Sequence, residues 1–249
     1  MHYLSVISIF KNETMNLKVW LDHYLWQGVD HFYLIDNGST DNPMEILFDY
    51  VSRGLVTYYY GPEKHRQQQY YKEMFDREKL RDNTYWLMVC DIDEFYFGMK
   101  HKIRTELKSL EHYHLIYSSW YMFGSDGLLK QPPDIRTAIT HREEQIINKD
   151  SKYIFKTKAI PNSSHIWIHG LVNFYDDERT LRDDNIIRLN HYVIQSLEFF
   201  QKIKMTRGAA DFAEGEYVRN MNYFFEADKN ATFEDLTLKN LITNPPEDY

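Results

Sequence analysis

Cysteine is nearly absent from the sequence: Cys90 is the single one among 249 residues, so no disulfide can form within the chain. No apolar run reaches roughly 18 residues, the length that a membrane-spanning helix needs. A basic segment followed by an apolar one, the pattern of a leader peptide, is also lacking. We therefore expect a cytoplasmic protein with no integral membrane segment. These features leave the oligomeric state open.

Positive charge is in deficit. The chain has 29 Lys and Arg residues against 37 Asp and Glu residues, and its net charge is −8. An acidic protein repels phosphate backbones unless it has a local basic patch, and the sequence shows none. We therefore expect no nucleic-acid partner. Hydrophobic residues make up 43 % of the chain and charged residues 27 %, which is typical of folded soluble domains and excludes a disordered chain.

Glycine is scarce as well, with 10 residues, and neither common glycine-rich phosphate loop is present. No G-x-G-x-x-G follows the first apolar segment, and no G-x-x-x-x-G-K-[ST] occurs anywhere. The chain therefore lacks the signatures of Rossmann dinucleotide-binding proteins and P-loop nucleotidases. If the protein binds a phosphate, other groups must hold it.

Segments typical of strands and helices alternate over the first ninety residues. Apolar, β-branched and aromatic segments predict strands at residues 3–10, 31–35, 55–60 and 85–90. Amphipathic spacing, Pro43 and flanking turn residues predict helices at residues 16–27, 43–53 and 65–79. This alternation predicts an α/β fold whose central sheet is parallel and has right-handed crossovers.

Polar residues follow the predicted strands at the points where each strand ends. In a parallel sheet, ligands bind beyond the carboxyl ends of the strands, so these residues are the candidate site. Asp91 and Asp93 follow the fourth strand, and carboxylates at this spacing can share a divalent cation where the chain bends. Oxygen ligands favour Mg²⁺ or Mn²⁺. An acidic surface turn is the alternative interpretation.

Several segments, taken in their order, resemble GT-A glycosyltransferases, in particular the branch of families 2 and 92. They are SIFKNE at 8–13, WLDHY at 20–24, DNGSTD at 36–41, DIDEF at 91–95, WYMFGSDG at 120–127, and NHY at 190–192 followed by Ser196, Glu198, Phe199 and Lys202. The last segment is one residue shorter than in the family pattern. The resemblance spans about residues 3–208, which makes it more specific than any single motif.

The resemblance implies a GT-A (nucleotide-diphospho-sugar transferase) fold, a Rossmann-like mixed and mostly parallel central sheet flanked by helices. We expect a single domain at residues 1–220, with a nucleotide-binding part at about 1–100 and an acceptor-side part at about 101–220. Residues 221–249 are expected to form a polar C-terminal extension that packs loosely or helps an oligomer form.

The implied activity is metal-dependent transfer of a sugar, expected to be a hexose, from a nucleotide-diphosphate donor to a carbohydrate or glycoconjugate acceptor. A UDP-sugar is the favoured donor, and inversion is the favoured stereochemistry. Asp91 and Asp93 match the Asp-x-Asp motif that holds Mn²⁺ or Mg²⁺ on the donor diphosphate, and His191 matches the histidine that completes the metal shell. His169 is the alternative metal-ligating histidine.

The resemblance also implies a nucleotide site. The residues expected to bind the nucleotide are Lys11, Asn12, Glu13, Asp36, Asn37, Arg66 and Asp91, and Lys202 is expected to clamp the diphosphate together with Lys204 and Arg207. Asp36 is expected to serve as a turn residue as well as a ligand. Solvated surface charge is the alternative for Arg66 and for the three basic residues near 202–207. The basic stretch of Lys152, Lys156 and Lys158 is open to the same two interpretations.

An inverting transfer requires a carboxylate that accepts the proton of the acceptor hydroxyl. Asp126, in a glycine-containing loop at 124–127, is the first candidate, and Glu143 and Glu144 are the alternatives. Trp120 and Tyr121 are expected either to stack on acceptor sugars or to pack in the core.

Two other functions use comparable features. A sugar-1-phosphate nucleotidylyltransferase has a related fold and metal, but it should have a glycine-rich, arginine-containing loop where this chain has Lys11, Asn12 and Glu13. A non-catalytic carbohydrate-binding protein would use aromatic residues, which form 16 % of the chain, but it is expected to be a β-sandwich.

Overall fold

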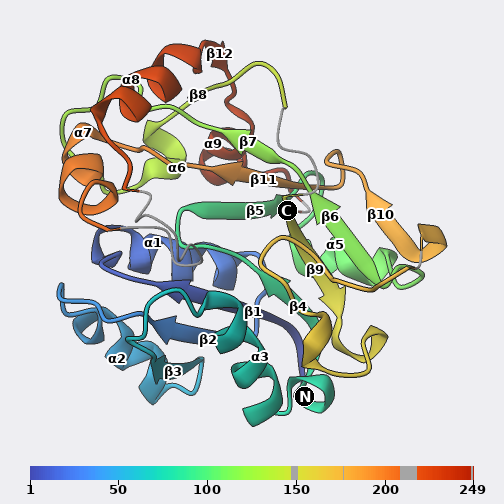
Figure 1. The fold of residues 1–249 in the computed structure, drawn as a ribbon. Helices are drawn as coiled ribbons and strands as arrows, with labels where there is room; N and C mark the ends of the chain where they lie inside the picture. The colour runs from blue at the N-terminus through green and yellow to red at the C-terminus, as the bar shows by residue number, and fades with distance from the viewer. Residues whose placement is uncertain (147–150, 176, 208–217, 248) are drawn as a thin grey trace.

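The computed structural model describes residues 1–146, 151–175, 177–207, 218–247 and 249. Its centre is a seven-stranded sheet with the order β10-β6-β9-β4-β1-β2-β3 (Figure 1). The strands are β1 (His2–Phe10), β2 (His31–Asp36), β3 (Val56–Tyr60), β4 (Thr84–Val89), β6 (Leu115–Ser118), β9 (Lys152–Lys156) and β10 (Thr180–Arg182).

The four strands predicted from the sequence form one parallel block. β3, β2, β1 and β4 are neighbours in this order, and all three pairings are parallel. β9 lies antiparallel between β4 and β6, so the sheet is mixed and mostly parallel, as the resemblance implied. The carboxyl ends of β1, β2 and β4 therefore meet at one edge of the sheet.

The sheet is buried on both faces, because helices cover each side. Alternate residues of β1 enter two different cores: Leu4 and Val6 belong to one, and Ile7 and Ile9 to the other. The first core also contains apolar residues of α1 (Thr14–Trp26), α2 (Met44–Ser52) and α5 (Ile103–Ser109). The second contains the buried face of α3 (Gln67–Arg77). Burial on both faces explains why these strands are continuously apolar rather than alternating.

The helix predicted at residues 65–79 is shorter in the structure. His65 has a positive φ of 59°, and Arg66 is the N-terminal cap, so the helix starts at Gln67. Lys79 is left-handed too, with a φ of 50°, and the short helix α4 (Leu80–Asn83) follows it. Two left-handed residues thus confine α3 to a segment between them.

A second, three-stranded sheet extends the fold beyond β4. It has the order β5-β11-β7 and consists of β5 (Glu94–Gly98), β7 (Trp120–Met122) and β11 (Ile187–His191). β11 ends opposite the start of β5, with His191 paired to Glu94, and the amide of Tyr192 donates to the carbonyl oxygen of Asp93. This sheet therefore brings His191 to the acidic segment that follows β4.

The C-terminal segment differs from the loosely packed extension that the sequence suggested. It contains α8 (Met221–Asn230), β12 (Phe233–Glu234) and α9 (Thr237–Thr243), and β12 pairs with β8 (His141–Arg142). Leu238 and Leu241 of α9 are buried in the first core, and buried Asp235 forms an ion pair with Arg142 at 2.7 Å. The segment is mostly polar, but its few apolar residues pack into the core, and it is therefore part of the main fold.

The remaining described helices are short. They are α6 (Ile135–Ala138), α7 (Leu197–Phe199), the 3₁₀ turns Thr157–Ala159, Ser163–His165 and Asp177–Arg179, and the π-helical turn Phe200–Lys204. The glycine pattern of the sequence predicts that a helix carrying Lys202, Lys204 and Arg207 ends at Gly208, a residue that lies outside the described ones. None of the described helices combines the length and apolarity that a bilayer crossing requires.

Candidate active site

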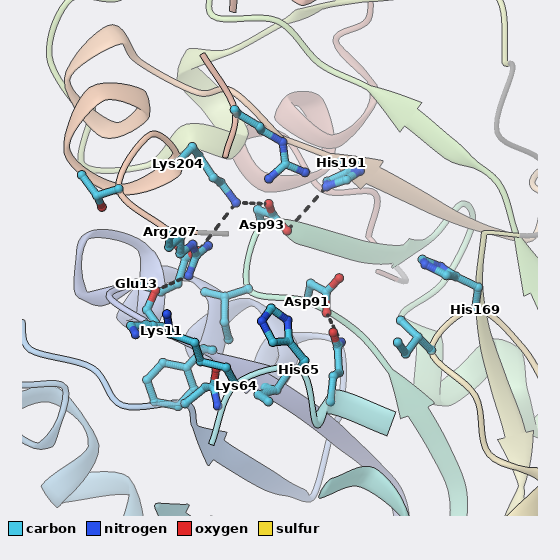
Figure 2. A pocket seen from close by; sticks show the side chains of 18 of the residues that line it. Lys11, Glu13, Lys64, His65, Asp91, Asp93, His169, His191, Lys204 and Arg207 are labelled. Carbon is cyan, nitrogen blue, oxygen red and sulfur yellow. Dashed lines mark hydrogen bonds and ion pairs between the residues drawn. The ribbon is translucent and has the colours of Figure 1, made fainter. Parts of the chain in front are cut away.

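A cavity of about 300 Å³ lies at the carboxyl edge of β1, β2 and β4 (Figure 2). Three carboxylates line it, and five cationic side chains surround them. The carboxylates are Glu13, Asp91 and Asp93, and the cations are Lys11, Lys64, Lys204, Arg207 and Arg219. The lining is therefore positively charged at neutral pH, although the whole protein is acidic, and such a concave cationic surface attracts anions.

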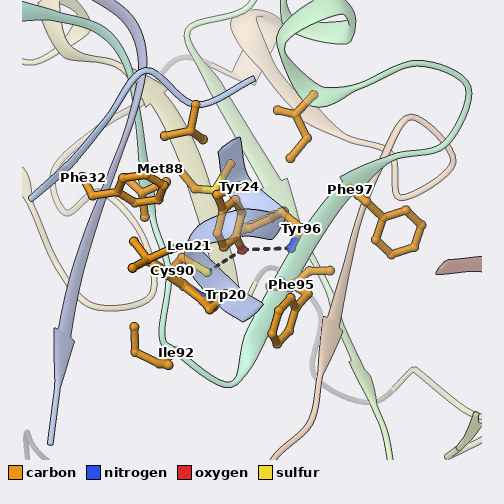
Figure 3. Packing of buried hydrophobic residues seen from close by; sticks show 14 of the residues in the cluster. Trp20, Leu21, Tyr24, Phe32, Met88, Cys90, Ile92, Phe95, Tyr96 and Phe97 are labelled. Atoms are coloured by element: carbon orange, nitrogen blue, oxygen red, sulfur yellow. Dashed lines mark hydrogen bonds between the residues drawn. The ribbon is translucent and has the colours of Figure 1, made fainter. Parts of the chain in front are cut away.

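The acidic loop after β4 is held in place by helix α1. The indole nitrogen of Trp20 donates to the carbonyl oxygens of Asp91 and Glu94. The hydroxyl of Tyr24 donates to the same Glu94 carbonyl at 3.0 Å, lies 2.9 Å from the Cys90 sulfur and accepts from the Tyr96 amide (Figure 3). The side chains of Trp20, Tyr24 and Cys90 are buried. The helix thereby fixes the backbone that carries Asp91 and Asp93.

Asp91 is paired with a lysine from the neighbouring strand. The Lys152 ammonium on β9 lies 2.8 Å from Asp91 Oδ2 and 3.7 Å from Glu94 Oε2. Burial opposes the charged form of Lys152, but the two carboxylates outweigh it and hold its pKa well above the ordinary value. Glu94 is fully buried, accepts hydrogen bonds from the Asp91 amide and the Trp120 indole, and has its pKa raised by burial to about 7. Glu94 therefore stabilises the loop through these hydrogen bonds and does not line the cavity.

Asp93 is contacted by two groups from the C-terminal half of the chain. Lys204 Nζ lies 2.5 Å from Asp93 Oδ2, and His191 Nε2 lies 3.5 Å from Asp93 Oδ1. All three side chains are buried. Burial alone would raise the pKa of Asp93, but the positive charge of Lys204 and the contact with His191 prevail and hold it well below its usual range. Asp93 is therefore ionised at neutral pH.

A divalent cation fits part of this arrangement. The 3.5 Å between Asp93 Oδ1 and His191 Nε2 is less than the sum of two Mg²⁺–ligand distances of about 2.1 Å, so both can contact one ion. Mg²⁺ commonly takes one or two protein ligands and completes its shell with water and substrate phosphates. Asp91 is turned to Lys152, and within the described ranges no three His, Cys, Asp or Glu side chains converge on a common point. Asp93 and His191 are thus the pair that would hold the cation.

The first strand end contributes a second ion-pair cluster. Arg207 donates to the Glu13 carboxylate and to the Lys11 carbonyl oxygen, and Lys204 Nζ lies 3.7 Å from Glu13 Oε1. The segment after β11 is thereby connected to the end of β1. Lys204 stands between Asp93 and Glu13, as Figure 2 shows.

Several polar atoms around the cavity are buried and have no hydrogen-bond partner among the described residues. They are Glu13 Oε2, His65 Nδ1, His191 Nδ1 and Arg219 Nε. Buried polar groups are nearly always paired in native proteins. They are four of eleven such atoms in the described part of the chain, and they leave hydrogen-bonding capacity in the cavity lining that a polar ligand would use.

Of the residues predicted to bind the nucleotide, Lys11, Glu13, Asn37 and Asp91 line the cavity. Asn37 also donates to the carbonyl oxygens of Gly61 and Glu63, which anchors the loop after β3.

Asn12 and Asp36 are not among the residues that line the cavity. Asn12 has a positive φ of 55° and accepts from the Thr40 amide, while Asp36 accepts from the Ser39 amide and the Tyr58 hydroxyl. Asn12 thereby connects the loops after β1 and β2. Asp36 stabilises the turn after β2, which is the turn role expected of it, and contacts β3.

Arg66 and Lys202 lie outside the cavity as well. Arg66 pairs with Glu63 and Glu73, and exposed Lys202 pairs with Glu198 one helical turn away, at 2.8 Å. Of the three basic residues expected at the diphosphate, Lys204 and Arg207 line the cavity and Lys202 does not, and next to Arg66 it is Lys64, His65 and Gln67 that line it.

The candidate base Asp126 is not brought to the cavity. Its carboxylate accepts from the amide and hydroxyl of Thr140 and from the His141 amide. Asp126 has a φ of 49°, so three hydrogen bonds hold a left-handed loop residue in place. The alternatives Glu143 and Glu144 are not in the lining either, and burial raises the pKa of Glu143.

Trp120 and His169 both line the cavity, and Tyr121 packs in the core. The Trp120 ring lies 4.6 Å from the His191 ring and 5.5 Å from the His169 ring, measured between centroids. His169 Nδ1 lies 2.8 Å from the Ser151 carbonyl oxygen and, unlike His191, has no described contact with Asp93. The structure thus places His191 at the acidic segment and His169 across the cavity.

Two cationic residues of the lining, Lys64 and Arg219, were not foreseen from the sequence. Lys152 was considered only as part of a basic stretch, and its burial was not recognised, although the apolar Tyr153, Ile154 and Phe155 that follow it indicate a buried strand. Arg219 lies in a polar region far along the chain, and no local pattern distinguishes it.

The profile of glycosyltransferase family 92 matches residues 2–243. The chain belongs to this family. Two family 92 proteins are among its relatives: one of Ricinus communis is 22 % identical over 208 residues, and one of Arabidopsis thaliana is 28 % identical over 234 residues. These alignments cover 81 % and 85 % of the chain but 37 % and 38 % of the relatives, so the chain spans little more than a third of their length.

Solved structures with a similar fold include S. aureus TarS in complex with UDP, at 13 % identity and a TM-score of 0.45, covering 98 % of this chain and 70 % of that one. A putative glucose-1-phosphate thymidylyltransferase from Bacillus anthracis has 11 % identity and a TM-score of 0.47, covering 85 % and 97 %. Family 92 membership and the mixed, mostly parallel sheet agree with the GT-A fold implied by the resemblance.

Proposed function

We propose that this family 92 chain transfers a sugar from a nucleoside-diphosphate donor, a UDP-sugar, to a carbohydrate or glycoconjugate acceptor. The observation that carries the proposal is the cavity at the carboxyl edge of the parallel strands, where five cations surround Asp91 and Asp93. A diphosphate matches this excess of positive charge. Family membership supplies the chemistry, because it favours glycosyl transfer over nucleotidyl transfer and over sugar binding alone.

The residues have distinct parts in this proposal. Lys11 and Asn37, at the ends of β1 and β2, line the cavity and would contact the nucleoside. Lys204 and Arg207, from the segment after β11, lie beside Glu13 at the end of β1 and neutralise the phosphates. Charge grows on the leaving diphosphate as the glycosidic bond breaks, so cations fixed by ion pairs before the reaction stabilise the transition state. Glu13, which pairs with both, keeps the two cations at the cavity.

We propose Mn²⁺ or Mg²⁺ as the cofactor. When bound, the ion would neutralise part of the diphosphate charge and so favour its departure. Asp93 and His191 would hold it, for the geometric reasons given above. Asp91 acts through Lys152 instead, and this pair fixes the orientation of the loop.

We propose that the transfer inverts the configuration at the anomeric carbon. None of the three cavity carboxylates is proposed as the base that takes the proton from the acceptor hydroxyl. Glu13, Asp91 and Asp93 each have a lysine or arginine as an ion-pair partner, and the pKa of Asp93 is held well below its usual range.

The experiment is a transfer assay with a panel of UDP- and GDP-sugars and free sugar acceptors in the presence of Mn²⁺. The proposal predicts release of UDP that depends on the acceptor, and NMR of the first product formed reports its anomeric configuration. Release of pyrophosphate from a nucleoside triphosphate and a sugar 1-phosphate would instead favour a nucleotidylyltransferase. Sugar binding without any turnover would favour a carbohydrate-binding protein.

A further inference from the structure

The ion pair between Lys204 and Asp93 occupies the carboxylate that would bind the divalent cation. Lys204 Nζ is 2.5 Å from Asp93 Oδ2, and both side chains are almost fully buried. A cation that approaches Asp93 therefore meets a positive charge already in contact with that carboxylate. At such distances, and with little water between them, the repulsion between the two cations is strong.

The position of Lys204 gives it a second set of partners. It ends the π-helical turn Phe200–Lys204, lines the cavity, and lies 3.7 Å from Glu13 and 5.6 Å from the Phe199 ring. Its long side chain thus reaches Asp93, Glu13 and the cavity from one backbone position. π-Helical turns occur often at functional sites. Lys152 differs, because β9 holds it rigidly between Asp91 and Glu94.

We propose that Lys204 neutralises Asp93 in the donor-free protein and moves to the diphosphate when the donor enters, which frees Asp93 for a divalent cation. The proposal rests on the function proposed above and adds an order of events to it. Without a donor, Lys204 keeps the affinity for the cation low. With a diphosphate present, the ammonium gains a new anionic partner, and Asp93 becomes available beside His191.

The proposal makes donor and metal binding cooperative through one side chain. If the diphosphate raises the affinity for the cation, the cation must raise the affinity for the diphosphate by the same factor. Part of this coupling comes from direct contact between the cation and the phosphates. The remainder depends on Lys204 and disappears when its charge is removed.

The test measures Mn²⁺ binding to the protein alone, by titration followed with electron paramagnetic resonance. Lys204→Met keeps the length of the side chain and removes its charge, and we expect it to bind Mn²⁺ about tenfold or more tightly than the wild type. Lys204→Arg keeps the charge and should bind Mn²⁺ as weakly as the wild type. Lys18→Met, which removes an exposed charge on α1, controls for the change in net charge and should leave Mn²⁺ affinity unchanged.

A second titration repeats the measurement with saturating UDP. In the wild type, UDP should increase Mn²⁺ affinity strongly, and in Lys204→Met the increase should be smaller, because Asp93 is already free. Unchanged or weaker Mn²⁺ binding by folded Lys204→Met in the absence of UDP would overturn the proposal. Failure of the wild type to bind UDP would instead refute the proposed function, and the metal titration without UDP does not depend on that result.

Lys204→Met leaves Asp93 buried without its counter-charge and could fold poorly. Lys204→Gln is the second variant, because its amide can still donate to Asp93. For both variants the melting temperature is measured with and without Mn²⁺. The proposal predicts a larger rise with Mn²⁺ than in the wild type, since the ion replaces the missing charge. An equal or smaller rise in Lys204→Gln would overturn it.

Discussion

The indole nitrogen of Trp20 lies 3.0 Å from the carbonyl oxygen of Asp91 and 3.1 Å from that of Glu94. One buried side chain of α1 thus donates hydrogen bonds to the backbone at both ends of the acidic loop, residues 91–94. The loop follows a strand and has few backbone hydrogen bonds of its own, so its shape depends on this helix. The position of Asp93 relative to His191 is therefore set in part by a residue that does not line the cavity.

Trp20→Phe tests this dependence. Phenylalanine keeps an aromatic ring but cannot donate, and two buried carbonyl oxygens lose a partner, so we expect a melting temperature lower by about 3–8 °C. We also expect Mn²⁺-dependent UDP binding to weaken by about tenfold, because the loop no longer holds Asp93 in its position beside His191. Calorimetry and thermal unfolding measure the two effects. Trp26→Phe, on the same helix, is the control and should leave UDP binding unchanged.

The two histidines of the cavity should respond differently to substitution. His191→Ala removes the nitrogen that lies 3.5 Å from Asp93, and we expect Mn²⁺ affinity to fall by about tenfold or more. His169→Ala removes a ring held by the Ser151 carbonyl oxygen and should leave Mn²⁺ affinity as it is. A Mn²⁺ titration of both variants decides the assignment. The reverse pattern would transfer the metal-binding role to His169.

Asp126→Asn distinguishes a loop anchor from a base. The carboxylate accepts hydrogen bonds from three donors, and the amide has a single acceptor oxygen, so we expect a melting temperature lower by about 3–6 °C. UDP affinity should remain unchanged. A loss of turnover of about 10² or more with an unchanged melting temperature would show that Asp126 acts as the base after all.

His31 predicts a change of stability with pH. Burial, aided by the nearby charge of His2, lowers the pKa of His31 to about 4 in the folded protein. The unfolded chain has the ordinary value of about 6.5, so it binds more protons than the folded one between these two values. The stability contributed by neutral His31 is therefore complete above about pH 6.5 and is lost as pH falls towards 4.

The variant His31→Gln isolates this effect. Its free energy of unfolding is measured against that of the wild type by urea denaturation at several pH values. Between pH 7 and pH 4, the free energy of unfolding of the wild type should fall by about 2 kcal/mol more than that of the variant. This is less than the full pKa shift would give, because solvent screens part of the charge on His31. Parallel pH profiles for the two proteins would show that His31 titrates normally.

The parallel half of the sheet was predictable because its signals are local. Strands β1 to β4 are short apolar segments separated by turns, and β1, β2 and β4 carry polar residues directly at their ends. Neighbouring parallel strands bring those ends together, so Lys11, Glu13, Asn37, Asp91 and Asp93 could be assigned to one cavity.

The other half of the site depends on long-range packing. Lys152 reaches Asp91 because β9 lies antiparallel beside β4, and Lys204 reaches Asp93 across 111 residues of sequence. No local pattern reveals which face of a short helical turn meets the cavity, and for this reason Lys202 was assigned to the diphosphate together with Lys204. The C-terminal segment shows the same limit, since two leucines of α9 determine its packing.

The central claim is that this cavity binds a nucleoside diphosphate with the help of a cation held by Asp93. The most direct test is a calorimetric titration of UDP, with and without Mn²⁺, into the wild type and Asp93→Ala. We predict that Mn²⁺ tightens UDP binding to the wild type by about tenfold or more and has little effect on the variant. Absence of UDP binding to the wild type in Mn²⁺, or an equal effect of Mn²⁺ on both proteins, would contradict the account.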